Sequence, residues 1–394
     1  MAGDRPVLIA GAGIGGLSLA IALARHGIAS RVLERRQELV EAGAGIQLGP
    51  NAVGVLKRLG VADRLEPEVG KPACLRVHDA TTGGLLTELP LGGWIAERHG
   101  SPYWVAHRAD LHAALLEAAH ALPLVTLTTG CGIESFEARS GTVQARTHDG
   151  GTYEGAALVG ADGLWSVVRR QLWPDTQLTY SGKTAARAVI DCALAPAPFR
   201  DNATGVWLAP GAHVVHYPVR GGREIALVVI LEEDWPGEGW GLPVDRNGLL
   251  ERLRSFGGSL GGLLAGASDW RRWPLYDPAP LARWSRGRVT LIGDAAHPVL
   301  PFLAQGGALA LEDADTLAAA LQIWRSEPAL AIARYERVRR PRAVRVQNAS
   351  RRNGQIYHLP KPASLTRDLV LRIMPGRRIM TLYDWVYGWK PETL

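Results

Sequence analysis

The 394-residue sequence predicts an α/β fold in which a parallel, doubly wound sheet carries an inserted, mostly antiparallel sheet and C-terminal helices. Three observations predict it. Residues 7–27 have the pattern of an apolar strand, a glycine-rich turn and a helix. Two further apolar strands, 157–160 and 289–293, lead directly to an aspartate. Between them, residues 181–274 lack the strand–helix alternation of a parallel sheet and have the pattern of short strands with turns.

The turn after the first strand carries a dinucleotide-binding pattern. Gly11, Gly13 and Gly16 satisfy GxGxxG. They permit the tight turn, the approach of a pyrophosphate to the helix N-terminus, and close packing of helix and strand, respectively. Glu34 ends the next strand, about 20 residues on as the pattern requires, and suits an adenosine ribose. An acid there disfavours a 2′-phosphate, so NAD and FAD remain; the alternative is a helix that merely packs on a sheet.

Asp162 and Asp294 end the two other strands. Because the carboxyl ends of parallel strands gather along one crevice, Glu34, Asp162 and Asp294 are expected to line one elongated ligand. NAD needs only one such unit, whereas the ribityl chain of FAD is rich in hydroxyls that suit an aspartate at a strand end. The glycine-rich stretch 257–266 lacks the context of a second dinucleotide site and is expected to be loop and helix.

Three motifs in this order, GxGxxG, ADGxxSxxR and GDAAHxxxPxxxQGG, resemble the single-component (class A) FAD-dependent aromatic hydroxylases. That family includes p-hydroxybenzoate, salicylate and 3-hydroxybenzoate hydroxylases. The resemblance runs from residue 7 to about 320. The stretches GAGIQLGPNA (43–52), HRADLHAAL (107–115) and YGWKP (387–391) are also similar to the family.

The resemblance implies a role for each motif residue. Glu34 would hold the ribose and Asp294 the ribityl chain, and Arg108 would lie near the diphosphate and ribityl region. Gly45 and Ile46 would pass close to the isoalloxazine, and the Asp162 motif would serve both FAD and the incoming nicotinamide nucleotide. The expected residues of a non-covalent FAD site are Gly11, Gly13, Gly15, Gly16, Glu34, Arg35, Gly45, Ile46, Arg108, Asp162, Asp294, Pro301, Gln305, Gly306 and Gly307.

The stretch after Asp294 fits a reduced flavin, which carries negative charge around N1 and the C2 carbonyl. A helix that begins near Gln305, Gly306 and Gly307 would point its free N–H groups and positive dipole end at that charge. Pro301 would stiffen the loop that faces the flavin. His297 is expected to be structural within its turn.

The stretch HVVHYPV (213–219) indicates where a substrate binds. Side chains alternate along a strand, so His213 and Tyr217 share one face. With an ordinary pKa near ~6.5, a histidine can take a phenol proton at neutral pH. In related enzymes such a His/Tyr pair helps to ionise the substrate, so both are predicted catalytic residues. The alternative is a histidine on a solvent-facing side of the sheet.

Three further residues are predicted substrate contacts. Arg187 can receive a carboxylate, although a surface ion pair is an equal alternative. Trp207 can wall the pocket, with core packing as its alternative. Phe302, beside Pro301, gives the pocket an apolar wall where some relatives carry a polar residue, so the resemblance does not fix the substrate.

The bulk composition sets limits on class and location. Net charge is +6, and the basic stretch 337–352 is expected to be the solvated face of a helix rather than a nucleic-acid site. Three dispersed cysteines make a disulfide framework or a metal site unexpected and favour the cytoplasm. The apolar run 7–24 is long enough for a membrane span, but its patterned glycines argue against one.

The domain organisation is predicted as follows. A discontinuous FAD-binding domain comprises 1–70, 101–180 and 275–350; a substrate-binding domain comprises 71–100 and 181–274; and 351–394 form a C-terminal helical segment. No integral membrane or nucleic-acid partner is expected, and the assembly is expected to be a monomer or homodimer.

The resemblance implies a monooxygenase that hydroxylates a small phenolic, carboxylated aromatic compound with NADH or NADPH and O2, through a flavin C4a-hydroperoxide. Three alternatives stay open. One is an FAD monooxygenase or epoxidase for a larger apolar substrate, the second a flavoprotein that binds FAD without turnover, and the third a simple NAD dehydrogenase.

Overall fold

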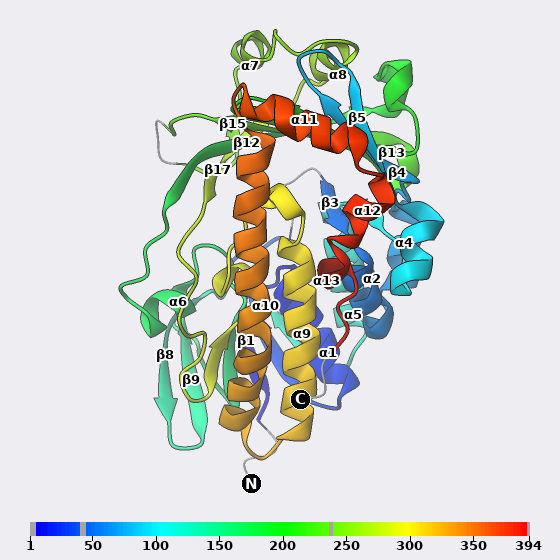
Figure 1. Cartoon of the computed structure of the whole chain (residues 1–394). Helices are drawn as coiled ribbons and strands as arrows, with labels where there is room; N and C mark the ends of the chain where they lie inside the picture. Colours follow the sequence, from blue (N-terminus) through cyan, green and yellow to red (C-terminus); the bar gives the residue numbers. More distant parts are fainter. Residues whose placement is uncertain (1–4, 40–44, 236–238, 392–394) are drawn as a thin grey trace.

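A computed structural model describes residues 5–39, 45–235 and 239–391 (Figure 1). Its centre is a five-stranded sheet in the order β18-β11-β1-β2-β7, with every neighbouring pair parallel. The prediction of a doubly wound parallel sheet is therefore confirmed. The strands are β1 (Val7–Ala10), β2 (Ser30–Leu33), β7 (Val125–Thr128), β11 (Ala157–Gly160) and β18 (Val289–Leu291).

The inserted sheet has eight strands in the order β16-β17-β12-β15-β14-β13-β4-β5. Only β13 and β4 pair in parallel, which confirms the prediction of a mostly antiparallel sheet. Its strands are β4 (Cys74–Asp79), β5 (Leu85–Pro90), β12 (Tyr180–Asp191), β13 (Ala203–Ala209), β14 (Ala212–Val219), β15 (Glu224–Glu232), β16 (Leu242–Pro243) and β17 (Arg271–Tyr276). How the chain divides into domains stays a prediction.

Two smaller sheets complete the strands. One pairs β3 (Gly45–Leu48) with β6 (Trp104–His107), and the other joins β8 (Ile133–Arg139), β9 (Thr142–Thr147) and β10 (Thr152–Gly155). The pair β3–β6 sets Gly45 opposite His107, immediately before Arg108. This short ladder therefore brings two segments predicted to lie near FAD to the same place.

Helices cover both sheets. Those of the first half are α1 (Ile14–Arg25), α2 (Pro50–Leu59), α3 (Ala62–Leu65), α4 (Gly92–His99), α5 (Arg108–His120) and α6 (Val167–Leu172). Those of the second half are α7 (Arg246–Arg252), α8 (Leu260–Gly266), α9 (Gly306–Ile323), α10 (Pro328–Tyr357), α11 (Ala363–Ile373), α12 (Gly376–Thr381) and α13 (Asp384–Tyr387). The apolar run 7–24 divides between β1 and α1, and no helix in the described ranges is long and apolar enough to cross a membrane.

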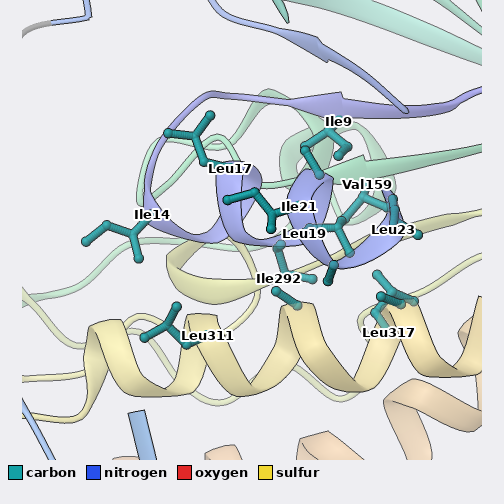
Figure 2. Close-up of a cluster of buried hydrophobic side chains, with 14 of the residues drawn as sticks. Ile9, Ile14, Leu17, Leu19, Ile21, Leu23, Val159, Ile292, Leu311 and Leu317 are labelled. Carbon is teal, nitrogen blue, oxygen red and sulfur yellow. The ribbon is translucent and has the colours of Figure 1, made fainter. Parts of the chain in front are cut away.

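The main core lies where α1 packs between the parallel sheet and α9 (Figure 2). Complete burial of a Leu or Ile side chain contributes about 1.5–3 kcal/mol, so this cluster holds the glycine-rich turn and the start of α9 in a fixed relation. The labelled members of the cluster include Ile9, Leu19, Val159, Ile292, Leu311 and Leu317.

The long helix α10 lies beside α9 (Figure 1). It contains the basic stretch 337–352, so the prediction of a helix is confirmed, and it continues past the predicted boundary at residue 350. Pro341 lies inside the helix without ending it. Arg339, however, is completely buried rather than solvated, because carboxylates on α9 face it.

Those carboxylates are Glu312 and Asp313, both completely buried. Arg339 lies 2.7 Å from Glu312 and donates from Nε to Asp313 Oδ1 at 2.8 Å. The other oxygen of Asp313 accepts from the backbone N–H of Gly293 at 3.0 Å and lies 2.5 Å from Nε2 of His297. Burial alone raises the pKa of Asp313, but His297 and Arg339 outweigh it and lower that pKa to about 2. The cluster therefore ties α9, α10 and the loop after β18 together.

We expect Arg339→Met to lower the free energy of unfolding by about 3–5 kcal/mol, because it leaves two buried carboxylates short of a counter-charge. Urea denaturation of the purified protein measures this. The matched control is Arg337→Met, an exposed arginine on the same helix, which should change stability by at most about 0.5 kcal/mol. Equal unfolding midpoints for the two variants would contradict the role assigned to the cluster.

Candidate active site

The loop between β1 and α1 has the backbone geometry of a phosphate-binding turn. Gly11 has φ +98°, and a β-carbon added to Gly16 would lie 2.0 Å from the Gly11 carbonyl oxygen. Gly15 packs against side chains of α9 and the β18 loop. A β-carbon on Gly13 would meet no protein atom within 4 Å, and α1 begins there without a side-chain cap. The free N–H groups of α1 therefore face open space, as anion binding requires.

Glu34 follows β2 and is buried. Its Oε2 accepts from the backbone N–H of Ala12 at 2.7 Å, and its Oε1 accepts from that of Arg36 at 2.9 Å. The carboxylate thus braces the glycine-rich loop and still lines a cavity, beside the exposed Arg35. His112 supports the same loop, with Nε2 2.7 Å from the Ala12 carbonyl oxygen. His112 lies in the stretch 107–115, so this contact shows how that family-like stretch supports the glycine-rich loop.

Asp162 and Asp294 lie after β11 and β18, as predicted. Asp162 Oδ2 accepts from the Val167 N–H at 2.8 Å, whereas its buried Oδ1 has no hydrogen-bond partner among the described residues. Burial raises the pKa of this carboxyl, and hydrogen bonds oppose that effect. Asp294 is exposed within the groove. Arg169 donates to the carbonyls of Asp294 and Ala295 at 3.2 and 3.0 Å, so the second motif holds the third in place.

Two connected cavities run along these strand ends. The first, here called the nucleotide cavity, has a volume of about 420 Å³ and is lined by Glu34, Arg35, Asp162 and Asp294. The second, the inner cavity, measures about 300 Å³ and lies under the eight-stranded sheet. Residues shared by both linings make them one groove: Gly13, Arg108, Ala161, Gly163, Arg187 and Asp294.

The start of α9 forms one side of the inner cavity. Gly306 and Gly307 line it together with Pro301, Gly45 and Ile46. A β-carbon on Gly307 would lie 2.6 Å from Ile46 Cδ1, whereas one on Gly306 would meet no protein atom within 4 Å. The positive end of the α9 dipole therefore opens into the cavity, as the sequence predicted. Gly43 and Ala44 of the same motif lie outside the described residues.

Gln305 does not line either cavity. Its side chain is buried, and its Oε1 accepts from Nδ2 of Asn51 at 2.8 Å. Asn51 also lies 2.7 Å from Glu312 Oε1. Gln305 is thus an anchor for the start of α9 in this structure, and His297 is structural, as predicted, through its contact with Asp313.

The inner face of the eight-stranded sheet covers the cavity. His213, Val215 and Tyr217 of β14 all line it, so the predicted alternation is confirmed and the solvent-facing alternative for His213 is wrong. Val215 lies opposite Val228 of β15, and Val228 lies opposite Arg187 of β12. Arg187 therefore occupies the row between His213 and Tyr217.

His213 and Tyr217 are both buried and uncharged at neutral pH. Burial lowers the pKa of His213 well below its ordinary value, and His358 and Lys183 lower it further. Burial raises the pKa of Tyr217 to about 12, although Arg187 opposes this. The ring of Tyr217 packs on Gly45, where an added β-carbon would lie 2.2 Å from Cε2. The pair thus offers a proton acceptor and a proton donor over the cavity.

Arg187 is a cation without a carboxylate partner in the described ranges. Its guanidinium lies over the Trp273 ring at 5.3 Å, and its Nε is buried with no hydrogen-bond partner. Burial lowers the pKa of Arg187, Tyr217 opposes that effect and Arg108 adds to it. A buried, unsatisfied donor on a cavity wall is costly unless a ligand accepts its hydrogen bond. Among the described residues, Arg187 therefore makes no surface ion pair of the kind considered as the alternative.

Two predicted substrate contacts lie elsewhere. Trp207 is on the outer face of the sheet, where it stacks on His78 at 4.0 Å and packs among core residues. It lines neither cavity, because it lies opposite Val214 of β14, whose side chain points away from the face that carries His213 and Val215. Phe302 is buried behind His213, 5.5 Å from that ring, and Pro301 rather than Phe302 forms the apolar wall.

Sequence reasoning missed the residues behind the cavity. His358, at the end of α10, lies 2.7 Å from His213 and contacts Glu232. These residues are far apart in the chain, and no motif links them. Asn51 belongs to the family-like stretch 43–52. Its partners Gln305 and Glu312 are more than 250 residues further along the chain, so only the fold shows these contacts.

The groove fits FAD. It joins an open helix N-terminus at Gly13, a carboxylate at the end of β2, two strand-end aspartates and a second open helix N-terminus at Gly306. The unpartnered Oδ1 of Asp162 is a further polar atom that such a ligand can satisfy. An elongated dinucleotide, with an anionic pyrophosphate between its adenosine and its ribityl chain and a polar ring system at the far end, matches this order of groups.

Comparison with known proteins gives concordant results. A family model described as FAD binding domain matches residues 4–350. The 3-hydroxybenzoate 6-hydroxylase of Polaromonas naphthalenivorans (strain CJ2) is 38% identical over 390 residues, covering 98% of this chain and 96% of the relative. The 3-amino-4-hydroxybenzoate 2-monooxygenase of Streptomyces platensis is 36% identical over 386 residues, covering 98% and 96%.

Among solved structures, HpxO of Klebsiella pneumoniae complexed with FAD and uric acid is similar, with a TM-score of 0.85 and 28% identity over 96% of each chain. The fold, the three motifs and the extent of these matches agree with one another. The chain therefore belongs to the FAD binding domain family, as a flavoprotein monooxygenase of the aromatic hydroxylase group.

Proposed function

We propose that this enzyme hydroxylates a small aromatic acid that carries both a phenolic hydroxyl and a carboxylate. NADH or NADPH donates the electrons, and O2 is the oxidant. Bound FAD supplies the redox chemistry and the activation of oxygen. The observation that carries the proposal is the inner cavity, where His213, Tyr217 and Arg187 face the loops expected to hold the flavin. The relatives named for 3-hydroxybenzoate and 3-amino-4-hydroxybenzoate support this substrate class.

Arg187 binds the substrate carboxylate in this proposal. Its fork of donors suits a bidentate contact, and its unsatisfied Nε supplies the reason to bind an anion. Apolar side chains around it hold the ring and exclude water: Val215, Val228, Ile230, Val299 and Pro301. The same lining favours the alternative of a larger apolar substrate, but a guanidinium in the cavity wall whose Nε has no partner among the described residues argues against that alternative.

His213 accepts the phenolic proton, which makes the aromatic ring a stronger nucleophile toward an electrophilic oxygen. Its depressed pKa keeps the imidazole neutral, and therefore able to accept a proton, at physiological pH. Tyr217, with a pKa of about 12, stays protonated and orients the substrate oxygen by donating a hydrogen bond. Arg187 and the N-terminus of α9 favour the resulting anion.

Each part of FAD is assigned to the residues that line the corresponding part of the groove. Glu34 holds the adenosine ribose, the α1 N-terminus the pyrophosphate, and Asp294 the ribityl hydroxyls. Arg35, Arg108 and Asp162 line the nucleotide cavity, where they contact FAD and the nicotinamide nucleotide that binds transiently. All three cysteines are free thiols, which supports a reducing compartment such as the cytoplasm, with a monomer or homodimer as the assembly.

A substrate panel tests the proposal. Purified holoenzyme is mixed with NADH, O2 and 3-hydroxybenzoate, 3-amino-4-hydroxybenzoate, salicylate or an apolar alkene, and products are identified. Stimulated NADH oxidation with a hydroxylated acid as product is the expected result. Turnover of the alkene alone, or of none of these compounds, would overturn the proposal.

We expect Asp294→Ala to weaken FAD binding by about 10-fold or more, because a charged acceptor for ribityl hydroxyls contributes about 1.5–3 kcal/mol. Titration of the apoprotein with FAD, followed by flavin fluorescence, measures the dissociation constant. Asp269→Ala removes an exposed carboxylate outside both cavities and is the matched control. An unchanged FAD affinity in Asp294→Ala would refute the ribityl assignment.

Arg187→Met should raise the KM for a hydroxybenzoate about 10- to 100-fold, since a charge-assisted hydrogen bond is lost. The KM for 3-methylphenol, which has no carboxylate, should change little. Steady-state kinetics with the two compounds separate this contact from a general distortion of the cavity. Equal losses for both would mean that Arg187 does not recognise the carboxylate.

His213→Ala should slow hydroxylation by about 10²–10⁴-fold while FAD content stays the same. The defect should diminish as pH rises toward the phenol pKa, because hydroxide then ionises the substrate without the base. Product formed per NADH consumed, measured from pH 6 to 9, isolates this step from flavin reduction. A ratio equal to that of the wild type at every pH would exclude His213 as the base.

A further inference from the structure

A chain of hydrogen bonds leads from the inner cavity to the protein surface. His213 lines the cavity, and its Nδ1 lies 2.7 Å from Nε2 of His358. The Nδ1 of His358 lies 2.9 Å from Oε1 of Glu232. The side chain of His358 is only 2% exposed, whereas that of Glu232 is 46% exposed. One end of the chain therefore faces substrate and the other faces water.

The carboxylate of Glu232 determines which atom donates and which accepts in each hydrogen bond of this chain. Burial raises the pKa of Glu232, but His358 and Lys183 outweigh that effect and lower it, so the group is ionised and accepts. His358 must then donate from Nδ1 and accept at Nε2. His213 in turn donates from Nδ1, which leaves the lone pair on its Nε2. That nitrogen has no hydrogen-bond partner in the part of the chain that the structure describes.

We propose that His358 and Glu232 form a proton relay through which His213 passes the phenolic proton to solvent. The inference rests on the proposed ionisation of a phenol by His213. The phenol O–H bond breaks and a bond forms at His213 Nε2. The Nδ1 proton of His213 moves to His358 Nε2, and the Nδ1 proton of His358 moves to Glu232, which releases it to water. The steps leave one phenolate, one proton in solvent and two neutral imidazoles.

Such a relay resolves a conflict in the cavity. A buried imidazolium at His213 would be costly because it lies away from water and near Lys183 and His358, which lower its pKa. Its other close neighbours, Phe302 and Tyr357, offer no negative charge. Concerted transfer moves the proton without placing a lasting cation there. Around His358 the charged groups are Glu232, Lys183 and Arg367, and only Glu232 can accept.

The fold positions the relay where three elements meet. His358 follows the last residue of α10, and its carbonyl accepts from the Gly211 N–H at 3.3 Å, next to the start of β14. Glu232 ends β15, and Lys183 of β12 lies opposite it in the sheet and 3.0 Å from its Oε1. In Figure 1 the upper end of α10 meets β12 and β15 at this point. The competing explanation is that the histidine pair only fastens α10 to the sheet.

Stopped-flow mixing of holoenzyme with 3-hydroxybenzoate, or with the panel acid that the wild type hydroxylates fastest, tests the relay. Phenolate absorbance reports ionisation, and a pH indicator reports proton release. Glu232→Gln and His358→Ala should slow both signals about 10- to 100-fold, less than loss of the base itself. His216→Gln is the control: His216 is a buried histidine of the same strand on the opposite sheet face, and this variant should match the wild type.

Chemical rescue separates a relay from a fastening contact. Free imidazole should restore ionisation in His358→Ala, and Glu232→Asp should retain most of the rate that Glu232→Gln loses. FAD content is measured first for each variant, so that misfolding is recognised. No rescue in a variant with full FAD content would overturn the relay, as would wild-type rates in both Glu232→Gln and His358→Ala while His213→Ala fails.

A substrate-free measurement makes the inference independent of enzyme turnover. Nitrogen-15 chemical shifts of the holoenzyme should show His213 and His358 as neutral imidazoles, both protonated at Nδ1. An Nε2-protonated His358 would contradict the required direction. If the wild type ionises no phenol in the panel, the proposed function fails and the relay fails with it; normal ionisation with unaffected relay variants removes the relay alone.

Discussion

The buried ion cluster between α9 and α10 is the constraint on which the site depends. Glu312 and Asp313 are completely buried, and they stay charged because Arg339 and His297 lie against them. Asp313 also holds the backbone of Gly293, immediately before Asp294, and Glu312 reaches the N-terminal end of α9 through Asn51. One cluster thus fixes both loops that are proposed to face the flavin. Without it, the open N-terminus of α9 would have no fixed relation to the strand-end aspartate.

The alternation of side chains along the antiparallel sheet decides which polar groups line the inner cavity. His213, Val215 and Tyr217 of β14 line the cavity, whereas Ala212 and Val214, which alternate with them, belong to a separate apolar core with residues of α7 and α8. This is why His213 and Tyr217 line the cavity while His216 and Trp207 pack on the far side of the sheet. A shift of one residue in the register would exchange the two sets, so the outer core that holds the register also preserves the active site.

Local patterns predicted the parts of the site that lie next to each other in sequence. The turn at Gly11, the acid Glu34 and the strand-end aspartates follow from spacing alone, because each motif is completed within one strand–turn–helix unit. Period-two alternation predicted that His213 and Tyr217 share one face of the sheet, but it left open whether that face meets the cavity or solvent. It could not decide between core and pocket for Trp207, since that requires knowing which face the parallel sheet covers. The contacts of His358, Asn51 and Arg339 join distant segments, and only the tertiary fold reveals them.

The electrostatics of the cavity limit how His213, the proposed base, can work. Arg187 and the N-terminus of α9 favour a phenolate, but positive charge near the cavity also disfavours a protonated His213. If His213 kept the proton, the positive charges that stabilise the phenolate would destabilise the imidazolium. A hydrogen-bonded exit through His358 to the half-exposed Glu232 removes that opposition, because the positive charge leaves while the negative charge stays beside Arg187. Anion binding and proton export therefore support each other, and a substrate without an ionisable hydroxyl would use neither.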